Sequence, residues 1–243
     1  MKYAAQIQNV REVALTGTAD LGYWTEQLKS QGLVPVEHRG HARLLITGTN
    51  AKFGGFGFRE LGVGVFATAE QAGSHMEGLL LLHAFNSNRF FAFIERTFFS
   101  TPYYRGNVQV EVDPVRFALI RSADDSCSGR LGREGATVRE AETDQPGGWS
   151  GPIFLPGMAD VPHQDRKWFF AQLSGQTRTW AFQPGEDELA LPHRMAEPVF
   201  AWMLESGFAG LEWTVRTDAK HGKSKTYRRS QWGEVKLPVA AKA

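Results

Sequence analysis

The sequence has few of the features that mark secreted, membrane-spanning or strongly charged proteins. Its 243 residues contain one cysteine, Cys127, which excludes an internal disulfide. The formal net charge is only +1, so no overall field attracts nucleic acid or a membrane surface, although local patches stay open. The longest apolar run, around residues 79–82, is too short to span a bilayer, and MKYAAQIQNVREV lacks a signal-peptide core. We therefore expect a cytoplasmic protein with neither a nucleic-acid nor a membrane partner.

Aromatic residues and glycine are abundant by contrast. Seventeen phenylalanines, seven tryptophans and 26 glycines suit a β-rich interior better than a helical bundle. A chain of this length can bury a large core without disulfides, and we expect a single domain over residues 1–243. The fold class predicted is α+β and β-rich, with a closed or nearly closed antiparallel β-barrel and a few flanking helices.

Alternation and turn signals divide the chain into strands, helices and loops. Helices are expected over residues 21–28, over residues 88–100 and from Pro198 to Gly207. Loops are expected over residues 122–135 and 142–162, which are rich in glycine, proline or polar residues. The expected strands cover residues 10–17, 33–36, 42–48, 58–66, 78–85, 107–112, 115–121, 168–173, 178–182, 208–217 and 224–235.

The stretch NSNRFFAFIERTFFSTPYYRG, residues 86–106, is the predicted working centre. Ser87 or Asn88 can cap a helix, and Pro102 prevents the helix from continuing. Within this helix, one set of residues follows the three-or-four spacing of a buried stripe, and two arginines share another face. The predicted stripe is Phe90, Phe93, Ile94 and Phe98, and the two arginines are Arg89 and Arg96.

Tyr103 and Tyr104 follow the proline directly and need hydrogen-bond partners if they are buried. The alternative is that both pack as aromatic side chains at a helix end. Glu60 lies on the strand before, on the same face as Gly62 and Gly64. These glycines either leave room beside the carboxylate or let the sheet bend.

His83 is the polar member of the strand GLLLLHAF, which we expect to be antiparallel to the strand of Glu60. It is either a core histidine or a base that shares a cavity with Glu60. His38 and His41 lie three apart on a turn without a third ligand, so no metal site is predicted. Neither the block at residues 48–67 nor the GKS of residues 222–224 has the glycine order of a nucleotide loop. The basic residues 220–229 are expected in a solvated turn, and no cofactor is predicted.

Two motifs together resemble the acetoacetate decarboxylase-like superfamily over roughly residues 10–237. The segment GFGFRE, ending in Glu60, resembles a Gly-aromatic-Glu strand of that family. Residues 96–104, RTFFSTPYY, resemble an Arg-x-x-aromatic-x-x-Pro-Lys-Lys helix end, with Tyr103 and Tyr104 in place of the two lysines.

The resemblance implies a β-barrel fold and a set of site residues, but not the family's chemistry. A phenol cannot form the imine that the first lysine forms in acetoacetate decarboxylase. The catalytic candidates implied are Glu60, Tyr103, Tyr104 and His83, and the substrate-binding candidates are Arg96, Arg89 and Phe58. Arg96 can equally be structural, paired with a carboxylate.

Three classes of function stay open at this point. The first is a cofactor-independent enzyme, decarboxylase-, lyase- or hydratase-like, acting on a small oxo- or carboxylate-bearing metabolite without a Schiff base. The second is a non-catalytic barrel that binds a small organic acid or ketone, in which backbone or arginine groups satisfy Glu60. The third, an interaction protein, predicts an exposed apolar patch instead. The oligomeric state is open, a homo-oligomer included.

Overall fold

The computed structural model describes residues 3–71, 74–122, 125–135, 137, 139–158, 160–192 and 198–235. Most of these residues belong to two β-sheets. The larger sheet comprises β1 (Tyr3–Asp20), β2 (Val34–Pro35), β3 (Glu37–His38), β4 (His41–Phe53), β5 (Phe56–Gln71), β6 (Ser74–Asn86), β7 (Tyr103–Arg105), β11 (Thr143–Phe154), β12 (Lys167–Ala181) and β14 (Ala209–Arg228). The smaller sheet comprises β8 (Asn107–Val112), β9 (Val115–Ser122), β10 (Asp125–Arg130) and β13 (Glu188–Ala190).

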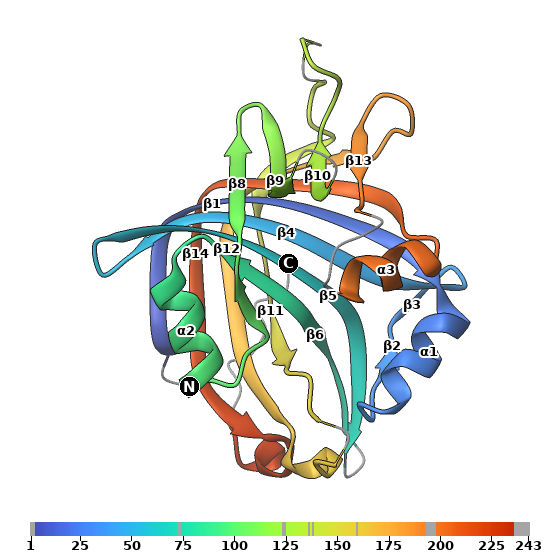
Figure 1. Ribbon diagram of the computed structural model, residues 1–243, viewed down its shortest axis with the longest axis vertical. Coiled ribbons are helices and arrows are strands. Elements are labelled where there is room, and N and C mark those ends of the chain that lie inside the picture. The colour runs from blue at the N-terminus through green and yellow to red at the C-terminus, as the bar shows by residue number, and fades with distance from the viewer. Residues whose placement is uncertain are drawn as a thin grey trace.

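The long strands of the larger sheet form a nearly closed ring (Figure 1). The strand order is β2-β5-β4-β1-β14-β12-β11-β6-β7, and β5 also pairs with β6, so the order returns on itself. The long ladders are antiparallel, whereas β6 and β11 meet in parallel through two residue pairs only. The predicted β-rich fold with a nearly closed ring of strands is therefore confirmed.

Within the described residues, helices are few and short: α1 (Leu21–Lys29), α2 (Arg89–Phe98) and α3 (Pro198–Glu205), with two 3-10 turns, η1 (His163–Asp165) and η2 (Arg229–Glu234). All three helices lie where the sequence predicted helices. The Asp20 carboxylate accepts the backbone N–H of Tyr23 at the start of α1, and Gly207, with φ +66°, follows α3. In the described part of the chain, no helix is long and apolar enough to cross a membrane.

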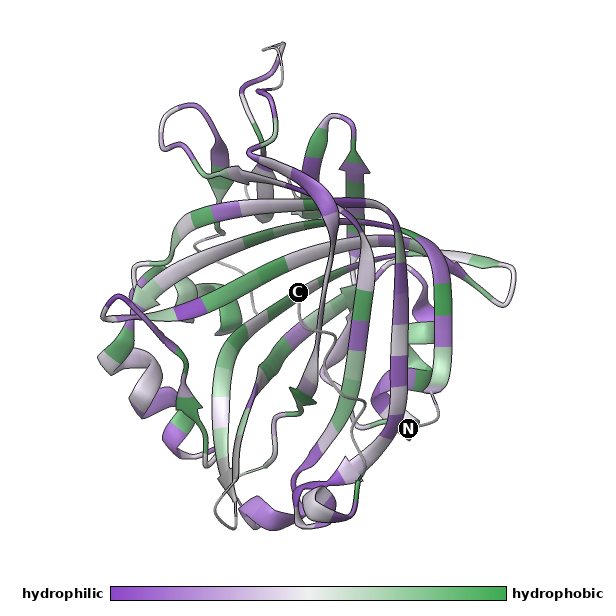
Figure 2. Ribbon diagram, turned by 180° about the vertical axis from the view of Figure 1, so that it is seen from behind, coloured by the Kyte–Doolittle hydropathy of each residue, from purple (hydrophilic) through white to green (hydrophobic). Residues whose placement is uncertain are grey.

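Each ring strand presents alternate residues to two faces of the sheet, as the banded colouring in Figure 2 shows. One face carries the main hydrophobic core, which α1, α3 and the small sheet cover. Its buried members include Val13, Leu15, Leu44, Ile46, Leu61, Val63, Val65, Trp213 and Val215 of the ring, with Trp24, Leu28, Phe117, Leu119, Phe200 and Met203. The opposite face carries a smaller cluster: Phe66, Leu79, Leu81, Ala84, Ile153, Leu155 and Phe169.

The predicted buried stripe of α2 is wrong. Phe90, Phe93 and Phe98 are 61%, 60% and 71% exposed, whereas Ala92 is the buried residue of the helix. The spacing was periodic, but periodicity does not tell which face of an aromatic-rich helix turns inward. The inward face is the one that carries Ala92 and Glu95.

Two predicted loops contain strands. The segment 122–135 contains β10, and the segment 142–162 contains β11. In β11, a Cβ added to Gly148 would lie 2.3 Å from the carbonyl oxygen of Leu173, so glycine permits a close approach between β11 and β12. The prolines of β11 are tolerated because β6 pairs with this strand at Ile153 and Phe154 only, which leaves most of one edge without a partner strand.

Two predicted hairpins are single strands. Residues 167–181 form one strand, β12, whose SGQ segment lies at a register shift between Ser174 and Thr177. Residues 209–228 form β14, which pairs with β1 on one side and β12 on the other. The basic residues from Lys220 to Arg228 were expected in a turn, but they lie in this strand because two neighbours satisfy its backbone.

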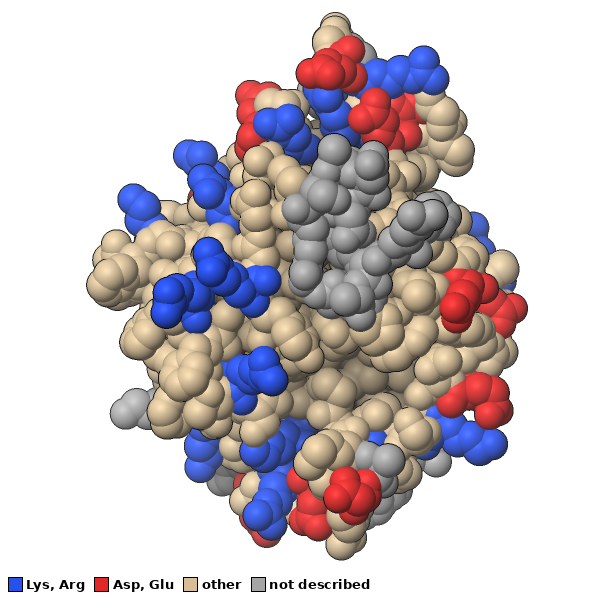
Figure 3. Space-filling view, viewed as in Figure 1, with Lys and Arg blue, Asp and Glu red and all other residues tan. Residues whose placement is uncertain are grey.

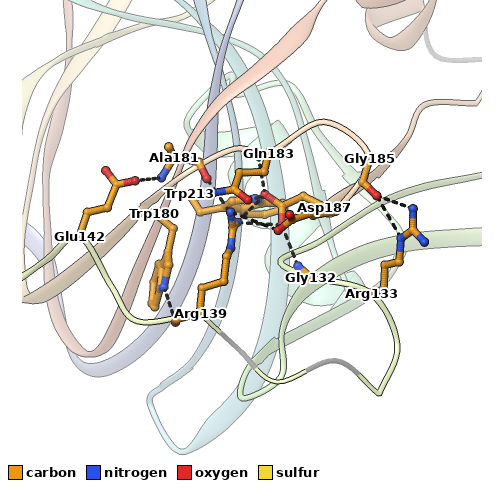
Figure 4. Close-up of polar contacts among 11 residues, drawn as sticks. Gly132, Arg133, Arg139, Glu142, Trp180, Ala181, Gln183, Gly185, Asp187 and Trp213 are labelled. Atoms are coloured by element: carbon orange, nitrogen blue, oxygen red, sulfur yellow. Dashed lines mark hydrogen bonds and ion pairs between the residues drawn. The ribbon is translucent and has the colours of Figure 1, made fainter.

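A buried carboxylate joins the small sheet and its loops to the ring (Figure 4). Asp187 has a fully buried side chain, and its Oδ1 accepts the backbone N–H of Gly132 at 2.8 Å. Its Oδ2 accepts the N–H of Gln183 at 2.8 Å and the indole N–H of Trp213 at 3.2 Å. The guanidinium of Arg139 completes the shell at 2.9 Å. Loop and strand backbones from distant parts of the chain therefore share one anion.

Loss of the Asp187 carboxylate should strongly destabilise the folded protein. Asp187→Ala should lower the free energy of unfolding by about 3–5 kcal/mol, because it leaves a cation and several N–H groups without their acceptor. The matched control is Glu186→Ala, which removes a 64% exposed carboxylate that lies 3.9 Å from the same arginine. This control should change stability by less than about 0.5 kcal/mol. Equal losses in the two variants, measured by chemical denaturation, would contradict the assigned role.

Candidate functional site

Glu60 is the centre of a hydrogen-bonded group on the face of the ring opposite the main core. It lies in β5 and is half-buried. The Tyr103 hydroxyl donates to Glu60 Oε1 at 2.8 Å, and the Asn86 amide nitrogen donates to Oε2 at 3.2 Å. Both carboxylate oxygens therefore have a side-chain donor. Two of the predicted catalytic candidates, Glu60 and Tyr103, are therefore in direct contact.

The end of α2 and the proline set the position of Tyr103. Ser100 adopts φ +57° directly after the helix, and the chain then turns into β7. The carbonyl of Pro102 accepts the backbone N–H of Ala84 at 2.9 Å, which starts the parallel pairing of β6 with β7. Tyr103 is thus level with Ala84, which is level with Gly62 of β5. This register directs the phenol to the face of Glu60.

The amide of Asn86 is oriented by a second contact. Its Oδ1 accepts the backbone N–H of Asn88 at 2.8 Å, so its nitrogen is the atom that faces Glu60. Asn88 in turn caps α2, because its own Oδ1 accepts the N–H groups of Phe90 and Phe91. The helix cap and the site carboxylate are therefore linked through one buried amide.

A second carboxylate and a lysine lie beside this group. Glu95 of α2 binds Lys223 Nζ of β14 at 2.7 and 2.5 Å, and Thr101 Oγ1 donates to Glu95 at 3.0 Å. The ammonium also lies over the rings of Phe99 and Phe169, at 4.8 and 4.6 Å from their centroids. The lysine is thus held on three sides while its side chain stays partly accessible.

Burial and the neighbouring charges shift two pKa values of the site upward. Burial raises the pKa of Glu60, and the charge of Glu95 adds to this; the Tyr103 hydroxyl, Lys223 and Asn86 oppose the rise without cancelling it. The pKa of Tyr103 lies well above its usual value because of burial and the charges of Glu60 and Glu95. The phenol therefore stays protonated, and the Glu60 carboxyl takes up a proton more readily than an exposed glutamate does.

A separate ion group lies further along β14. Arg216 Nη1 and His221 Nε2 contact the buried Glu12 carboxylate at 3.2 and 3.1 Å, and Arg216 Nε donates to Thr177 at 2.9 Å. Burial alone would raise the pKa of Glu12, but the contacts with His221 and Arg216 outweigh it and lower this pKa. His221 lies two residues from Lys223, so the same strand serves both groups.

Two catalytic candidates and one arginine lie away from Glu60. The His83 and Tyr104 rings stack with centroids 5.2 Å apart, and His83 also stacks on Phe85 of the main core. Arg96 lies over the Tyr104 ring at 5.6 Å. Because successive residues of β7 point to opposite faces, Tyr104 and Tyr103 are directed apart. The structure thus brings Tyr103, but neither His83 nor Tyr104, to the carboxylate.

The remaining candidates lie near α2. Phe58 is on the face of Glu60, and its ring packs edge-on against Phe91 at 5.3 Å. Arg89 is exposed at the start of the helix. Gly64 leaves no room in the site, since a Cβ there would lie 2.8 Å from the Leu79 side chain. That glycine serves close packing.

The sequence did not identify Asn86, Glu95, Thr101 or Lys223. Glu95 had a detectable signal, because it is the acidic residue in an otherwise aromatic and basic helix. Lys223 had none, since its contact with α2 spans 128 positions in the chain. No group of three or more histidine, cysteine, aspartate or glutamate residues suited to a metal is found among the described residues. Burial raises the pKa of the Cys127 thiol, which keeps it protonated.

The comparisons with known proteins identify the fold. No protein-family model matches the sequence, and no curated protein does. A structure of acetoacetate decarboxylase superposes with a TM-score of 0.57 and 11% identity, covering 92% of this chain and 88% of that one. Acetoacetate decarboxylase from Legionella pneumophila superposes with a TM-score of 0.57 and 12% identity, covering 93% of this chain and 87% of that one. A third structure is the enduracididine biosynthesis enzyme MppR, complexed with the condensation product of pyruvate and imidazole 4-carboxaldehyde. It superposes with a TM-score of 0.55 and 12% identity, covering 96% of this chain and 92% of that one. This chain therefore has the acetoacetate decarboxylase-like fold.

Proposed function

We propose that the protein is a cofactor-independent enzyme that moves a proton on a small oxo acid, in a lyase- or hydratase-like reaction without a Schiff base. The observation that carries the proposal is the 2.8 Å hydrogen bond between the Tyr103 hydroxyl and Glu60. Such a phenol–carboxyl pair can hold a proton at two places. The structural neighbours support the substrate class, since one is acetoacetate decarboxylase and another is MppR complexed with pyruvate.

The pair can act as a proton relay. When Glu60 is protonated, its O–H donates to the phenol oxygen, and the Tyr103 O–H is free to donate to an oxygen of the ligand. As negative charge develops on that oxygen, the phenol proton moves to it and the Glu60 proton moves to the phenol. The carboxyl ends ionised, and one proton has passed to the ligand. The raised pKa of Glu60 makes this protonated starting state easier to reach than in an exposed glutamate.

The surroundings of the pair suit a small anion with an apolar part. Lys223 carries three N–H donors, and its bonds to the two oxygens of Glu95 leave donor capacity toward the site. Phe169 belongs both to this lysine's contacts and to the apolar cluster that includes Leu79 and Leu81. A carboxylate end near the cation and a hydrocarbon end on the cluster would satisfy both.

Non-catalytic binding of a small organic acid is the second candidate. It predicted that backbone or arginine groups would satisfy Glu60. The donors are instead a phenol and an amide, Tyr103 and Asn86, and the pKa of the carboxyl is raised. This arrangement favours proton transfer over simple binding. The enzyme proposal also expected a histidine beside the pair, and the contacts of His83 place it with Tyr104 instead.

Ligand binding should depend on the Tyr103 hydroxyl. In a thermal-shift screen of β-keto, α-keto and plain carboxylic acids, a keto acid at about 100 times its Kd should raise the wild-type Tm by about 5 °C. Tyr103→Phe should lose this shift, and turnover of the selected acid should fall by about 100-fold or more. The matched control is Tyr23→Phe, which removes another tyrosine hydroxyl bonded to a glutamate, Glu205, at 2.8 Å. If no acid stabilises the wild type, the tyrosine is packing and the proposal fails.

Glu60 should weaken the folded state as the pH rises. Folding raises its pKa above the ordinary 4.5, so the folded state binds the proton more tightly and stability declines as the pH passes from that value through the raised pKa. Relative to wild type, Glu60→Gln should therefore gain about 2 °C or more in Tm between pH 4 and pH 8. Exposed Glu26→Gln is the control and should show no such trend. A relative Tm that falls with pH would refute the raised pKa.

The absence of imine chemistry can be tested directly. Borohydride added with the keto-acid panel should leave the mass of the protein unchanged, because the residues after Pro102 are phenols. A trapped adduct would overturn that part of the proposal. Peptide mapping would then distinguish Lys52, the lysine nearest to Glu60 in sequence, from Lys223, which the structure places beside Glu95. Loss of the adduct in Lys223→Arg would assign it to β14.

A further inference from the structure

Five exposed phenylalanines form one surface at the α2 side of the molecule. We call Phe53, Phe56, Phe90, Phe93 and Phe98 the aromatic patch; their exposed fractions run from 43% to 71%. The patch is continuous, because the half-buried Phe91 contacts both Phe53, at 6.3 Å between centroids, and Phe90, at 6.2 Å. Phe90, Ile94 and Phe98 then follow at four-residue intervals along one side of the helix.

The patch includes the tip of a hairpin that extends away from the ring. In Figure 1 the turn between β4 and β5 extends furthest to the left, beside α2. Gly54 and Gly55, at φ +57° and +86°, form the turn, and Phe53 is paired with Phe56 across it. Nothing lies within 4 Å of a Cβ added to either glycine, so the tip is open on all sides. Two phenylalanines are thus presented on a convex projection.

The charges around the patch are positive. Lys52, Arg59, Arg89 and Arg96 are exposed in the two segments that form it, residues 50–59 and 88–99. Glu95 is the one acidic residue of these segments, and both of its oxygens bind Lys223. In Figure 3, basic side chains gather on the left of this face, whereas acidic side chains lie at the right, top and bottom together with further basic ones.

We propose that the aromatic patch binds the surface of an anionic lipid bilayer, with the hairpin tip and α2 inserted at the headgroup level. Aromatic side chains favour this interface, and basic side chains beside them favour anionic headgroups. The sequence predicted no membrane partner from the net charge of +1, but the structure gathers the cations beside exposed apolar rings.

Two other occupants fit this surface less well. A second copy related by a two-fold axis would bring two surfaces together that both carry the positive charges of Lys52, Arg89 and Arg96. Single-stranded nucleic acid is bound along positively charged grooves with stacked bases, whereas Phe53 and Phe56 stand on a convex tip. An anionic bilayer meets the charge and the convex shape together.

Vesicle flotation tests the proposal on the full chain. The protein should float with vesicles of phosphatidylcholine and phosphatidylserine and not with phosphatidylcholine alone, and raising the salt from about 0.1 M to about 0.5 M should release it. The double variant Phe53→Ser, Phe56→Ser should lower the floated fraction by about tenfold. Met158→Ser is the matched control, because it removes a 72% exposed apolar side chain elsewhere and should float like wild type.

Other results would overturn the proposal. Equal flotation of wild type and double variant, or no flotation with either lipid mixture, would show that the patch does not bind membranes. A dimer in light scattering that the double variant dissociates, without vesicle binding, would assign the surface to a second copy. Binding of a single-stranded oligonucleotide in place of vesicles would assign it to nucleic acid. Because the substituted side chains are exposed, unchanged Tm values should accompany every variant.

Discussion

The alternation of side chains along the ring strands is the constraint on which the site depends. Glu60 of β5, Asn86 of β6 and Tyr103 of β7 converge because all three occupy the same face: Asn86 is level with Glu60, and Tyr103 is level with Gly62, the next residue on that face. One step along β7 directs Tyr104 to the opposite face, where it stacks with His83. The polar site and the main hydrophobic core therefore lie on opposite faces of one sheet. A shift of one residue in the register would direct the polar side chains into the core and core side chains into the site.

The polar groups of the candidate site do not all favour the folded state. The half-buried Glu60 carboxyl and Tyr103 phenol both have raised pKa values, because burial and the charge of Glu95 disfavour their ionised forms. The arrangement persists because Asn86, Thr101 and Lys223 satisfy the polar atoms around it. By contrast, Glu12 is more deeply buried than Glu60, but its contacts with a cation and a histidine lower its pKa. The two glutamates show how neighbours, and not burial alone, decide whether a carboxyl is stabilising.

Local sequence signals predicted the ends of α2 and two of the site residues, whereas contacts between distant parts of the chain determined which other residues join the site. Asn88 and Pro102 fixed the ends of α2, and the two motifs of the family resemblance singled out Glu60 and Tyr103, which are in contact. The predicted buried stripe of α2 was wrong because the spacing of apolar residues does not show which face of the helix packs against the rest of the protein. β11 and β14 were misread because glycine, proline and lysine are weak strand formers, yet neighbouring strands pair with their backbones. The role of Lys223 could not be predicted, because its contact with Glu95 joins residues 128 positions apart.

The unbroken length of β14 limits how the sequence can vary. Arg216, His221 and Lys223 project from this one strand to the buried ion group and to the candidate site. Substitutions at most positions between them leave the register intact, whereas a single inserted or deleted residue would turn every later side chain to the other face. Related sequences that keep this site should therefore differ in composition along the strand but not in its length. A length change between Arg216 and His221 would displace His221 and Lys223 together, and so disturb both groups.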